Sequence, residues 1–306
     1  MKSMKPPRPV STNLFAFLTL LIALSLGGWV SKSHASDYHS PRTAAIGGAG
    51  HAGPLLTDAI YLNPSFTSFV PTYMISASYS WYNGGTAAST DPSSTEGPLQ
   101  GRIWNISLQD GRSELFQAGF GFTQRSDSRW IHLGASKAVA RRLGFGVGAK
   151  FVLPNDPGKE IARDLTLSFS GIATEWLHTV IVADNLFLND SSRAYRLQRE
   201  ITLGTKINVM GILLLYLDPM WMPDGSWVNG ERFGWEAGME IIPYPDLYVR
   251  LGTFRNSNIP YAGTRGKGYG LGFGWLAPRL SLDYSYQTIE EPLSASAHNL
   301  GFTVYF

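Results

Sequence analysis

The sequence predicts an all-β fold, a closed antiparallel transmembrane β-barrel of about fourteen strands with an N-terminal segment in its lumen. Three observations carry this prediction. Stretches of about ten residues alternate apolar and polar side chains, long and short connections between them also alternate, and the chain ends inside such a stretch, "HNLGFTVYF". A β-sandwich would also alternate, but it has no reason to sort its connections by length.

The first residues have the features of a secretory signal peptide. A basic start precedes an apolar run at residues 14–30, and small residues at Ser33 and Ala35 suit cleavage after Ala35. We therefore expect residues 1–35 to be removed and the mature chain to begin at Ser36. The alternative is an uncleaved anchor helix, because the apolar run is nearly long enough to span a bilayer.

Composition narrows the class of protein. The 306 residues include no cysteine, so neither a disulfide framework nor a lipidated N-terminal cysteine is expected. A mean hydropathy of −0.05 is too low for a bundle of membrane helices. The precursor has a net charge of +2, but the leader contains four of its basic residues, which leaves the mature chain at about −2. The charge therefore gives no indication of a nucleic-acid partner.

The predicted strands share a period of two. In "RLSLDYSYQ", for example, apolar or aromatic residues occupy every second position from Leu280 to Tyr286, with polar residues between them. The same pattern predicts strands at residues 72–82, 101–109, 114–124, 129–138, 143–153, 163–172, 176–184, 198–208, 211–219, 231–241, 246–254, 267–276, 278–287 and 297–306. Their length suits tilted strands that cross a bilayer.

The connections favour a barrel in the outer membrane of a Gram-negative bacterium. Long connections at residues 83–100, 154–162, 185–197, 220–230, 255–266 and 288–296 alternate with short ones at 110–113, 173–175, 209–210, 242–245 and 277. The connection at 125–128 is the exception, because it is short where a long one is expected. Outer-membrane barrels have long outer loops and tight periplasmic turns.

The C-terminal strand needs a partner, because an unpaired strand at the chain end would fray. We expect it to pair with the first strand, which closes the sheet and removes both edges. Its apolar residues Leu300, Phe302 and Val304 would face lipid. The terminal aromatic residue, Phe306, resembles the recognition signal of the barrel assembly machinery. Aromatic residues near strand ends are expected in the interfacial girdles, namely Trp81, Trp104, Trp130, Trp275 and Tyr286.

Residues 40–69 lie before the first strand and do not alternate. Their glycines do not form a nucleotide-binding loop, because no strand precedes them and no Lys-Ser/Thr pair follows. The stretch predicts instead a glycine-rich turn at Gly47, Gly48 and Gly50, and then a short helix around residues 56–62. Asn63-Pro64 would end that helix.

This stretch resembles the N-terminal segment of the FadL-type outer-membrane proteins, the long-chain fatty acid transporter superfamily. The resemblance rests on a run of small residues with an acidic position and an Asn-Pro pair: Arg42, Ala44, Gly47, Gly48, Ala49, Ala52, Asp58, Asn63 and Pro64. It implies that residues 36–70 fold into the lumen as a hatch, with Gly47, Gly48, Asp58, Asn63 and Pro64 as the hatch motif. Residues 71–306 would then form the barrel of a monomer.

Two features differ from the family pattern. Ser65 stands where the family usually has alanine after Asn-Pro, and the outer connections are short and polar rather than long and apolar. In size the chain is closer to the short PorV-type members of type IX secretion. The resemblance implies passive transport of hydrophobic or small molecules across the outer membrane. The first alternative is a secretion or surface-attachment partner without transport, and the second is an outer-membrane enzyme.

Charged residues on the face opposite the apolar one are predicted to point into the lumen. They are Lys150, Asp164, Glu200, Lys206, Glu236, Glu240, Arg250 and Asp283. They would either form a salt-bridge network that holds the hatch or line a substrate path. Glu236 and Arg250, on neighbouring strands, are expected to be partners.

No catalytic, cofactor or metal site is expected. His51, His132 and His178 lie on separate elements, and their spacing is not that of a metal site. Asp218 and His178 alone do not make a catalytic constellation. The sequence therefore favours a protein that is not an enzyme.

Overall fold

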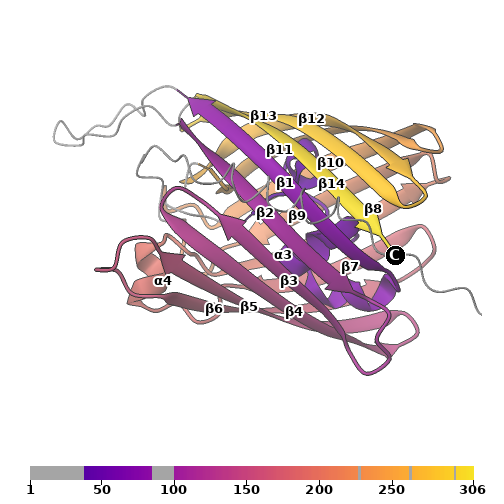
Figure 1. Ribbon diagram of the computed structural model, residues 1–306, viewed down its shortest axis with the longest axis horizontal. Helices are drawn as coiled ribbons and strands as arrows, with labels where there is room; N and C mark the ends of the chain where they lie inside the picture. Colours follow the sequence, from indigo (N-terminus) through magenta and orange to yellow (C-terminus); the bar gives the residue numbers. More distant parts are fainter. Residues whose placement is uncertain (1–37, 85–99, 227–228, 262–263, 293) are drawn as a thin grey trace, which may run out of the picture. The chain divides into compact units, whose positions relative to one another are not determined.

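The computed structural model describes residues 38–84, 100–226, 229–261, 264–292 and 294–306 (Figure 1). These residues form one closed barrel of fourteen strands, each hydrogen-bonded to its neighbours in sequence, with β1 paired to β14. The predicted fold class and strand number are therefore confirmed. The predicted signal peptide, its cleavage before Ser36, and most of the predicted connection at 83–100 lie outside the described residues.

All fourteen predicted strands are present. They are β1 Tyr73–Gly84, β2 Gln100–Asp110, β3 Gln117–Gln124, β4 Ser128–Ala140, β5 Leu143–Pro154, β6 Ala162–Ile172, β7 Leu177–Asp184, β8 Glu200–Val209, β9 Leu213–Trp221, β10 Phe233–Tyr244, β11 Leu247–Ile259, β12 Thr264–Ala277, β13 Leu280–Glu291 and β14 Ala295–Tyr305. The largest difference is in β11, which continues to Ile259 instead of ending at residue 254. A bulge after Phe254 lets pairing resume beyond the point where the alternation breaks.

The apolar face of the strands lies on the outside of the barrel. On β12, Tyr269, Leu271, Phe273 and Trp275 are 41 to 54% exposed, and the glycines between them face inward. One predicted girdle residue is an exception. Trp130 is only 1% exposed and packs inside the barrel with residues of the β7–β8 connection, so its assignment to the lipid interface was wrong. The indole N–H donates to Ser128 Oγ at 3.0 Å, which satisfies its one donor there.

The C-terminal strand closes the barrel. β14 pairs antiparallel with β1 over eleven residues, from Met74 opposite Tyr305 to Gly84 opposite Ala295. The Phe306 N–H donates to the Tyr73 carbonyl at 3.0 Å, and the two rings pack with centroids 5.6 Å apart. The chain therefore ends on a paired strand with no free sheet edge at this position.

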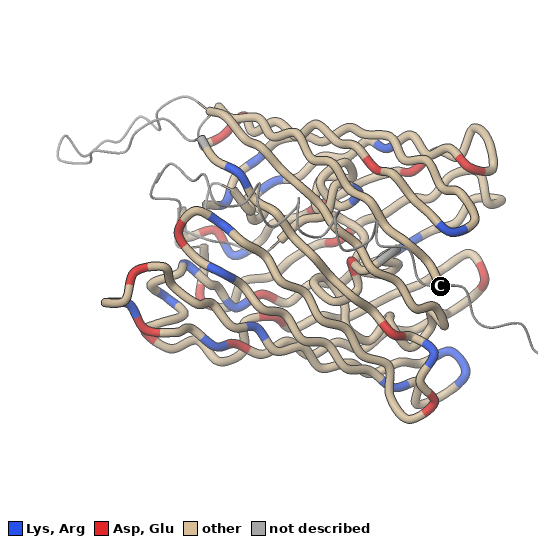
Figure 2. Tube along the Cα trace, viewed as in Figure 1, with Lys and Arg blue, Asp and Glu red and all other residues tan. Residues whose placement is uncertain are grey.

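The two ends of the barrel differ in their connections. We call the end with the connections after β3, β5, β7, β9, β11 and β13 the long-loop end, and the other the short-turn end. The β4–β5 and β10–β11 turns at the short-turn end have two residues each, whereas residues 185–199 join β7 to β8 at the long-loop end and include helix α4, Asp190–Ala194. Figure 2 shows many of the charged residues in these connections.

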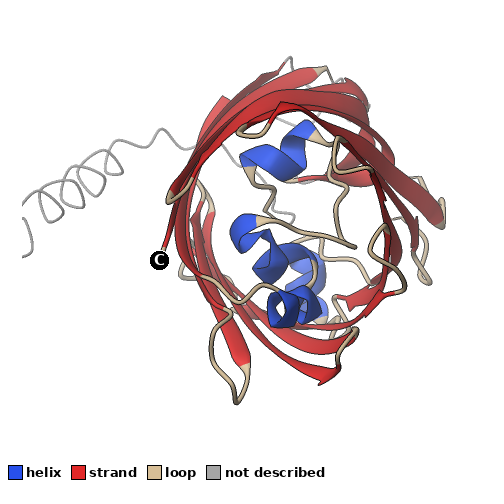
Figure 3. Cartoon of the chain, turned by 90° about the vertical axis from the view of Figure 1, so that its right-hand side faces the viewer, coloured by secondary structure: helices blue, strands red, loops and turns tan. Residues whose placement is uncertain are grey.

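Residues 41–69 include short helices that lie inside the barrel (Figure 3). They are α2 Pro41–Ala45, η1 Leu56–Asp58, α3 Ala59–Leu62 and η2 Pro64–Phe69. The helix predicted around residues 56–62 is present as η1 and α3. Helix α2 was missed, although Pro41 stands at its first position and the Ser40 side chain accepts the Thr43 N–H at 3.1 Å. Among the described residues, no helix is long and apolar enough to cross a membrane.

Candidate functional site

We call residues 38–70 the hatch, because they occupy the lumen. The barrel wall accepts their backbone at positions without a side chain. A Cβ atom at Gly270 would lie 2.0 Å from the Ala44 carbonyl oxygen, and one at Gly146 would lie 2.2 Å from the Ser65 nitrogen. Neither distance is compatible with a methyl group. The absence of a side chain at Gly270 therefore lets the hatch backbone approach β12 closely.

One side of the hatch is held by charged groups, which we call the ionic seat. Its hatch member is Arg42, which is fully buried. The Arg42 Nε donates to both carboxylate oxygens of Glu240 at 3.2 Å, and Arg250 donates to the same carboxylate at 2.8 Å. Arg250 also pairs with Asp283 at 2.5 Å, and the Arg42 Nη1 lies 3.6 Å from Asp58. Two arginines and three carboxylates thus share one water-poor site.

The other side of the hatch is held by neutral hydrogen bonds, which we call the neutral seat. Asn63 is fully buried, and its amide nitrogen donates to Ser170 Oγ on β6 and to the His51 carbonyl, both at 2.8 Å. The Ser65 N–H donates to Ser168 Oγ at 2.9 Å, and the Ser65 hydroxyl contacts Asn63 Oδ1 at 2.6 Å. The hydroxyl of Ser65, at the position where the FadL-type pattern usually has alanine, therefore adds polar contacts to this seat.

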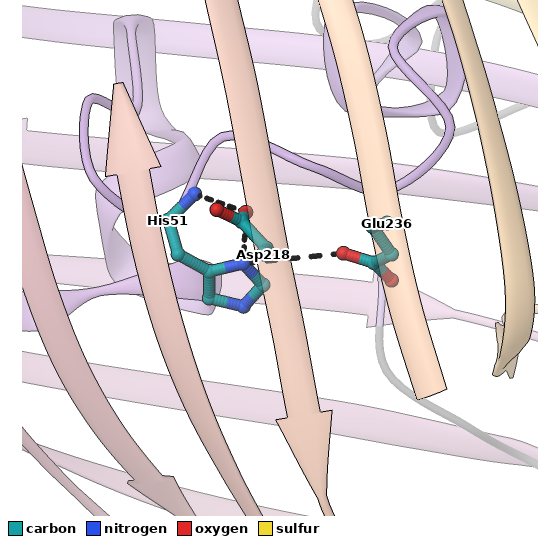
Figure 4. A group of neighbouring side chains, drawn as sticks. All are labelled: His51, Asp218 and Glu236. Atoms are coloured by element: carbon teal, nitrogen blue, oxygen red, sulfur yellow. Dashed lines mark hydrogen bonds and ion pairs between the residues drawn. The ribbon is translucent and has the colours of Figure 1, made fainter. Parts of the chain in front are cut away.

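A third contact joins the hatch to β9 and β10 (Figure 4). His51 Nδ1 lies 2.8 Å from Asp218 Oδ2 and 4.0 Å from Glu236 Oε2. The backbone N–H groups of Gly50 and His51 also donate to Asp218 Oδ2, at 2.7 and 2.9 Å. Burial lowers the pKa of His51, but the hydrogen bond and charge of Asp218, aided by Glu236, outweigh it and raise the pKa to about 9.

Three of the remaining predicted lumenal charges have polar partners, and the fourth, Lys206, packs against the hatch. Lys150 pairs with Asp184 at 3.0 Å, and Asp164 accepts the N–H of Phe187 at 2.9 Å. Glu200 pairs with Arg265 at 2.6 Å. The partially buried Lys206 packs against the hatch backbone, where a Cβ atom at Gly53 would lie 2.4 Å from the Lys206 Cδ. Of the two predicted roles for these charges, the contacts fit a network that fills the lumen better than the lining of a substrate path.

One expected pair is not formed. Glu236 lies on β10 four residues before Glu240, and Glu240 is the residue directly opposite Arg250 in the β10–β11 ladder. Arg250 therefore binds Glu240, and Glu236 accepts a hydrogen bond from the hydroxyl of Ser257 instead. Sequence spacing showed that the two strands are neighbours, but the register depends on the turn between them.

Two groups of site residues were missed because they come from distant parts of the chain. Arg42 appeared in the sequence only as part of the hatch run, although it is the one long cation among small residues there. His51 and Asp218 were treated as unrelated positions, because 167 residues separate them. Only pairing of β9 with β10 and insertion of the hatch bring them together.

Apolar side chains line the inner wall toward the long-loop end. Tyr82, Ile103, Phe254 and Ile289 face inward from four strands, and Tyr261 of the β11–β12 connection stacks on Tyr82 with ring centroids 5.1 Å apart. A second inward cluster is formed by Trp130, Val152, Ala162, Tyr195 and Leu197. Such apolar clusters are unusual for the interior of an outer-membrane type of barrel, which is commonly polar.

The fold and the site together define a fourteen-stranded barrel with a hatch in its lumen. The structure is similar to the CymD monoaromatic hydrocarbon channel, with a TM-score of 0.62 and 13% identity over 87% of this chain and 97% of that one. It is also similar to a Pseudomonas aeruginosa FadL homologue and to the Pseudomonas putida toluene transporter TodX, each with a TM-score of 0.60. The identities are 12% and 11%, and each likeness covers 90% of this chain and 99% of the other. The FadL-type fold that the hatch motif implies is thereby confirmed.

Sequence comparisons add nothing to this likeness. No protein-family model and no curated protein sequence matches the chain. At identities of 11 to 13%, the structural likeness establishes the fold and leaves the function to be argued from the site.

Proposed function

We propose that the chain is a monomeric outer-membrane barrel of a Gram-negative bacterium that passes small hydrophobic molecules through its lumen. The observation that carries this proposal is the apolar inner wall toward the long-loop end. On β11, Phe254 of that wall lies two residues from Gly252, against which the hatch backbone packs. The side chains of the cluster that includes Phe254 are at most 5% exposed, so an apolar molecule that enters at the long-loop end would have to part this packed apolar cluster before it meets the hatch.

On the side of β1, β13 and β14, the hatch leaves no room for a permeant molecule unless it moves. The cavity between the hatch and strands β1, β13 and β14 has a volume of about 20 Å³, which is room for about one water molecule. The hatch is joined to the wall by non-covalent contacts, at the ionic seat, at the neutral seat and at His51. We infer that release from one seat opens the path and that the other contacts retain the hatch.

The outer surface supports insertion into a lipid bilayer. Exposed apolar residues recur on strand after strand, among them Phe120, Leu133, Phe169, Ile181, Leu203, Leu217, Leu251, Leu271 and Leu300. A surface of this kind is stable next to lipid rather than water. Outer-membrane lipid and, through Phe306, the barrel assembly machinery are the partners that the proposal requires.

The proposal is tested by fixing the hatch to its neutral seat. The chain contains no cysteine, and the hydroxyl oxygens of Ser65 and Ser170 lie 2.7 Å apart, so the pair S65C/S170C suits a disulfide. Gram-negative cells that make this variant should take up radiolabelled toluene slowly after oxidation, and at the wild-type rate or faster after reduction, because the thiols weaken the neutral seat. A control pair within the wall is S76C/T303C, whose parent oxygens also lie 2.7 Å apart.

The outcomes separate the candidate functions. Slower uptake in the oxidised hatch variant, with no change in the wall variant, would support passage past the hatch. Equal uptake in both redox states would contradict passage past the hatch, and no uptake above that of cells without the chain would contradict transport. The second outcome would instead favour the secretion or surface-attachment role that the sequence left open.

A further inference from the structure

Two carboxylates face each other across the β9–β10 ladder. Asp218 and Glu236 occupy directly opposite positions in this antiparallel pair, and both point into the lumen with 0 and 4% of their side chains exposed. Like charges directly opposite are destabilising in a sheet, and burial strengthens their repulsion. A cation between them would remove this cost. The imidazole of His51 approaches both carboxylates from the hatch (Figure 4).

The protein groups around this cluster leave oxygen lone pairs unused. Asp218 Oδ2 accepts from two backbone N–H groups and contacts His51 Nδ1. Glu236 Oε1 accepts from the Ser257 hydroxyl, but the buried Oε2, which faces His51 at 4.0 Å, has no hydrogen-bond partner among the described residues. Asp218 Oδ1 is likewise buried and without a partner there. Buried acceptors of this kind are seldom left unsatisfied.

We propose that His51, Asp218 and Glu236 bind a divalent transition-metal ion, of which Zn²⁺ fits the donors best. One ligand atom from each residue can be chosen so that all three lie within 4.8 Å of one another. Around an ion with bonds of about 2.0–2.2 Å, tetrahedral donors lie about 3.4 Å apart. The His51 contacts of 2.8 and 4.0 Å bracket that separation, so small side-chain rotations would form the site.

The donor set selects among ions. An imidazole nitrogen with two carboxylates suits Zn²⁺ and its neighbours, whereas Mg²⁺ and Ca²⁺ prefer oxygen ligands throughout. The side chain of His51 is 12% exposed, which leaves an approach for the ion and a place for water as a fourth ligand. A proton on His51 Nδ1 would compete with the ion for the space between the imidazole and the two carboxylates, and metal binding would release that proton.

The consequence for the molecule is a metal-dependent link between hatch and wall. The three ligands come from the hatch, β9 and β10, so the ion would join segments that are otherwise connected by hydrogen bonds. A bound ion would therefore hold the hatch in place, and its removal would loosen that contact. This inference is independent of the transport proposal, because binding is measured on the folded barrel without any permeant molecule.

The test uses the whole mature barrel in detergent after treatment with a chelator. Equilibrium dialysis against Zn²⁺ should give one ion per wild-type chain, and H51Q and E236Q should each weaken binding about tenfold or more. H178Q is the matched control, because it removes a half-buried histidine from β7 and should leave the affinity unchanged. Heat-modifiable gel migration would confirm that each variant is folded.

A second measurement needs no variant. Co²⁺ bound to the wild-type chain should give the intense visible absorption of a four-coordinate ion, and Zn²⁺ should abolish it by displacement. Wild-type binding no stronger than that of H51Q and E236Q, or a Co²⁺ spectrum of the hydrated ion, would overturn the proposal. The space between His51 and the two carboxylates would then hold only the imidazolium proton.

Discussion

The hatch is held in two different ways on two sides of the lumen. At the ionic seat, near β10 to β13, Arg42 binds a buried carboxylate that a second arginine shares. At the neutral seat, on β6, amide and hydroxyl groups of Asn63 and Ser65 meet serine side chains. A buried charge that loses its partner costs several kcal/mol, whereas a neutral hydrogen bond contributes about 1 kcal/mol. If the hatch opens as proposed, we therefore expect the ionic side to be the fixed attachment and the neutral side to be the one that opens.

The largest effect is expected on single-channel conductance, when both seats are removed at once. Deletion of residues 40–66 should leave the barrel assembled, because the strands pair without the hatch, and should raise its single-channel conductance in a planar bilayer. A truncated barrel that conducts no more than the intact one would show that side chains of the wall fill the lumen. The comparison between the two seats would then have no bearing on passage.

The ionic seat is tested by R42M, which keeps an unbranched apolar side chain and removes the guanidinium and its charge. Glu240 is fully buried and would lose one of its two arginines, so we expect a loss of about 3–5 kcal/mol in the free energy of unfolding. Urea unfolding in detergent measures this loss. R279M, at an exposed arginine in the β12–β13 turn, is the control and should change stability little. A loss below 1 kcal/mol in R42M would remove the distinction between the seats.

The neutral seat is tested by N63A. The substitution removes donors to Ser170 and to the His51 carbonyl and leaves both acceptors in a buried site, so we expect a cost of about 1–3 kcal/mol. The same urea experiment measures it. If N63A proved more costly than R42M, the order of the two seats would be reversed and the ionic side would be the one that opens.

A smaller effect is expected for S65A, which introduces the residue that FadL-type proteins usually have after Asn-Pro. It removes the hydroxyl contacts with Asn63 and Ser170 but keeps the backbone hydrogen bond to Ser168, so the cost should be about 1 kcal/mol. The double variant R42M/S65A should show additive losses, because the two seats share no side chain. Coupling above about 0.5 kcal/mol would indicate that the seats act as one unit.

The smallest effect on stability is expected at the chain end, far from both seats. Phe306 is 64% exposed and contacts Tyr73. Its deletion should lower the amount of assembled barrel in the membrane while the folded fraction keeps its unfolding midpoint. Immunoblots of heat-modifiable barrel in outer-membrane fractions give the first quantity. An unchanged assembled level would contradict the role of Phe306 as an assembly signal.

The sequence by itself determined the architecture, because a β-strand exposes alternate residues to opposite faces whatever its neighbours are. The period of two therefore predicted all fourteen strands, and the apolar residue at every second position predicted the outward face of β12 and β14. The Asn63-Pro64 pair likewise predicted the end of the short helix, since proline restricts the residue before it.

Only the tertiary structure decided which charged and polar groups meet. Whether Arg250 binds Glu236 or Glu240 depends on the register set by the β10–β11 turn, and whether His51 reaches Asp218 depends on where the hatch crosses the lumen. These contacts join residues far apart in the chain, and local periodicity contains no information about them. The inward position of Trp130 has the same cause, because the connection that covers it comes from another part of the sequence.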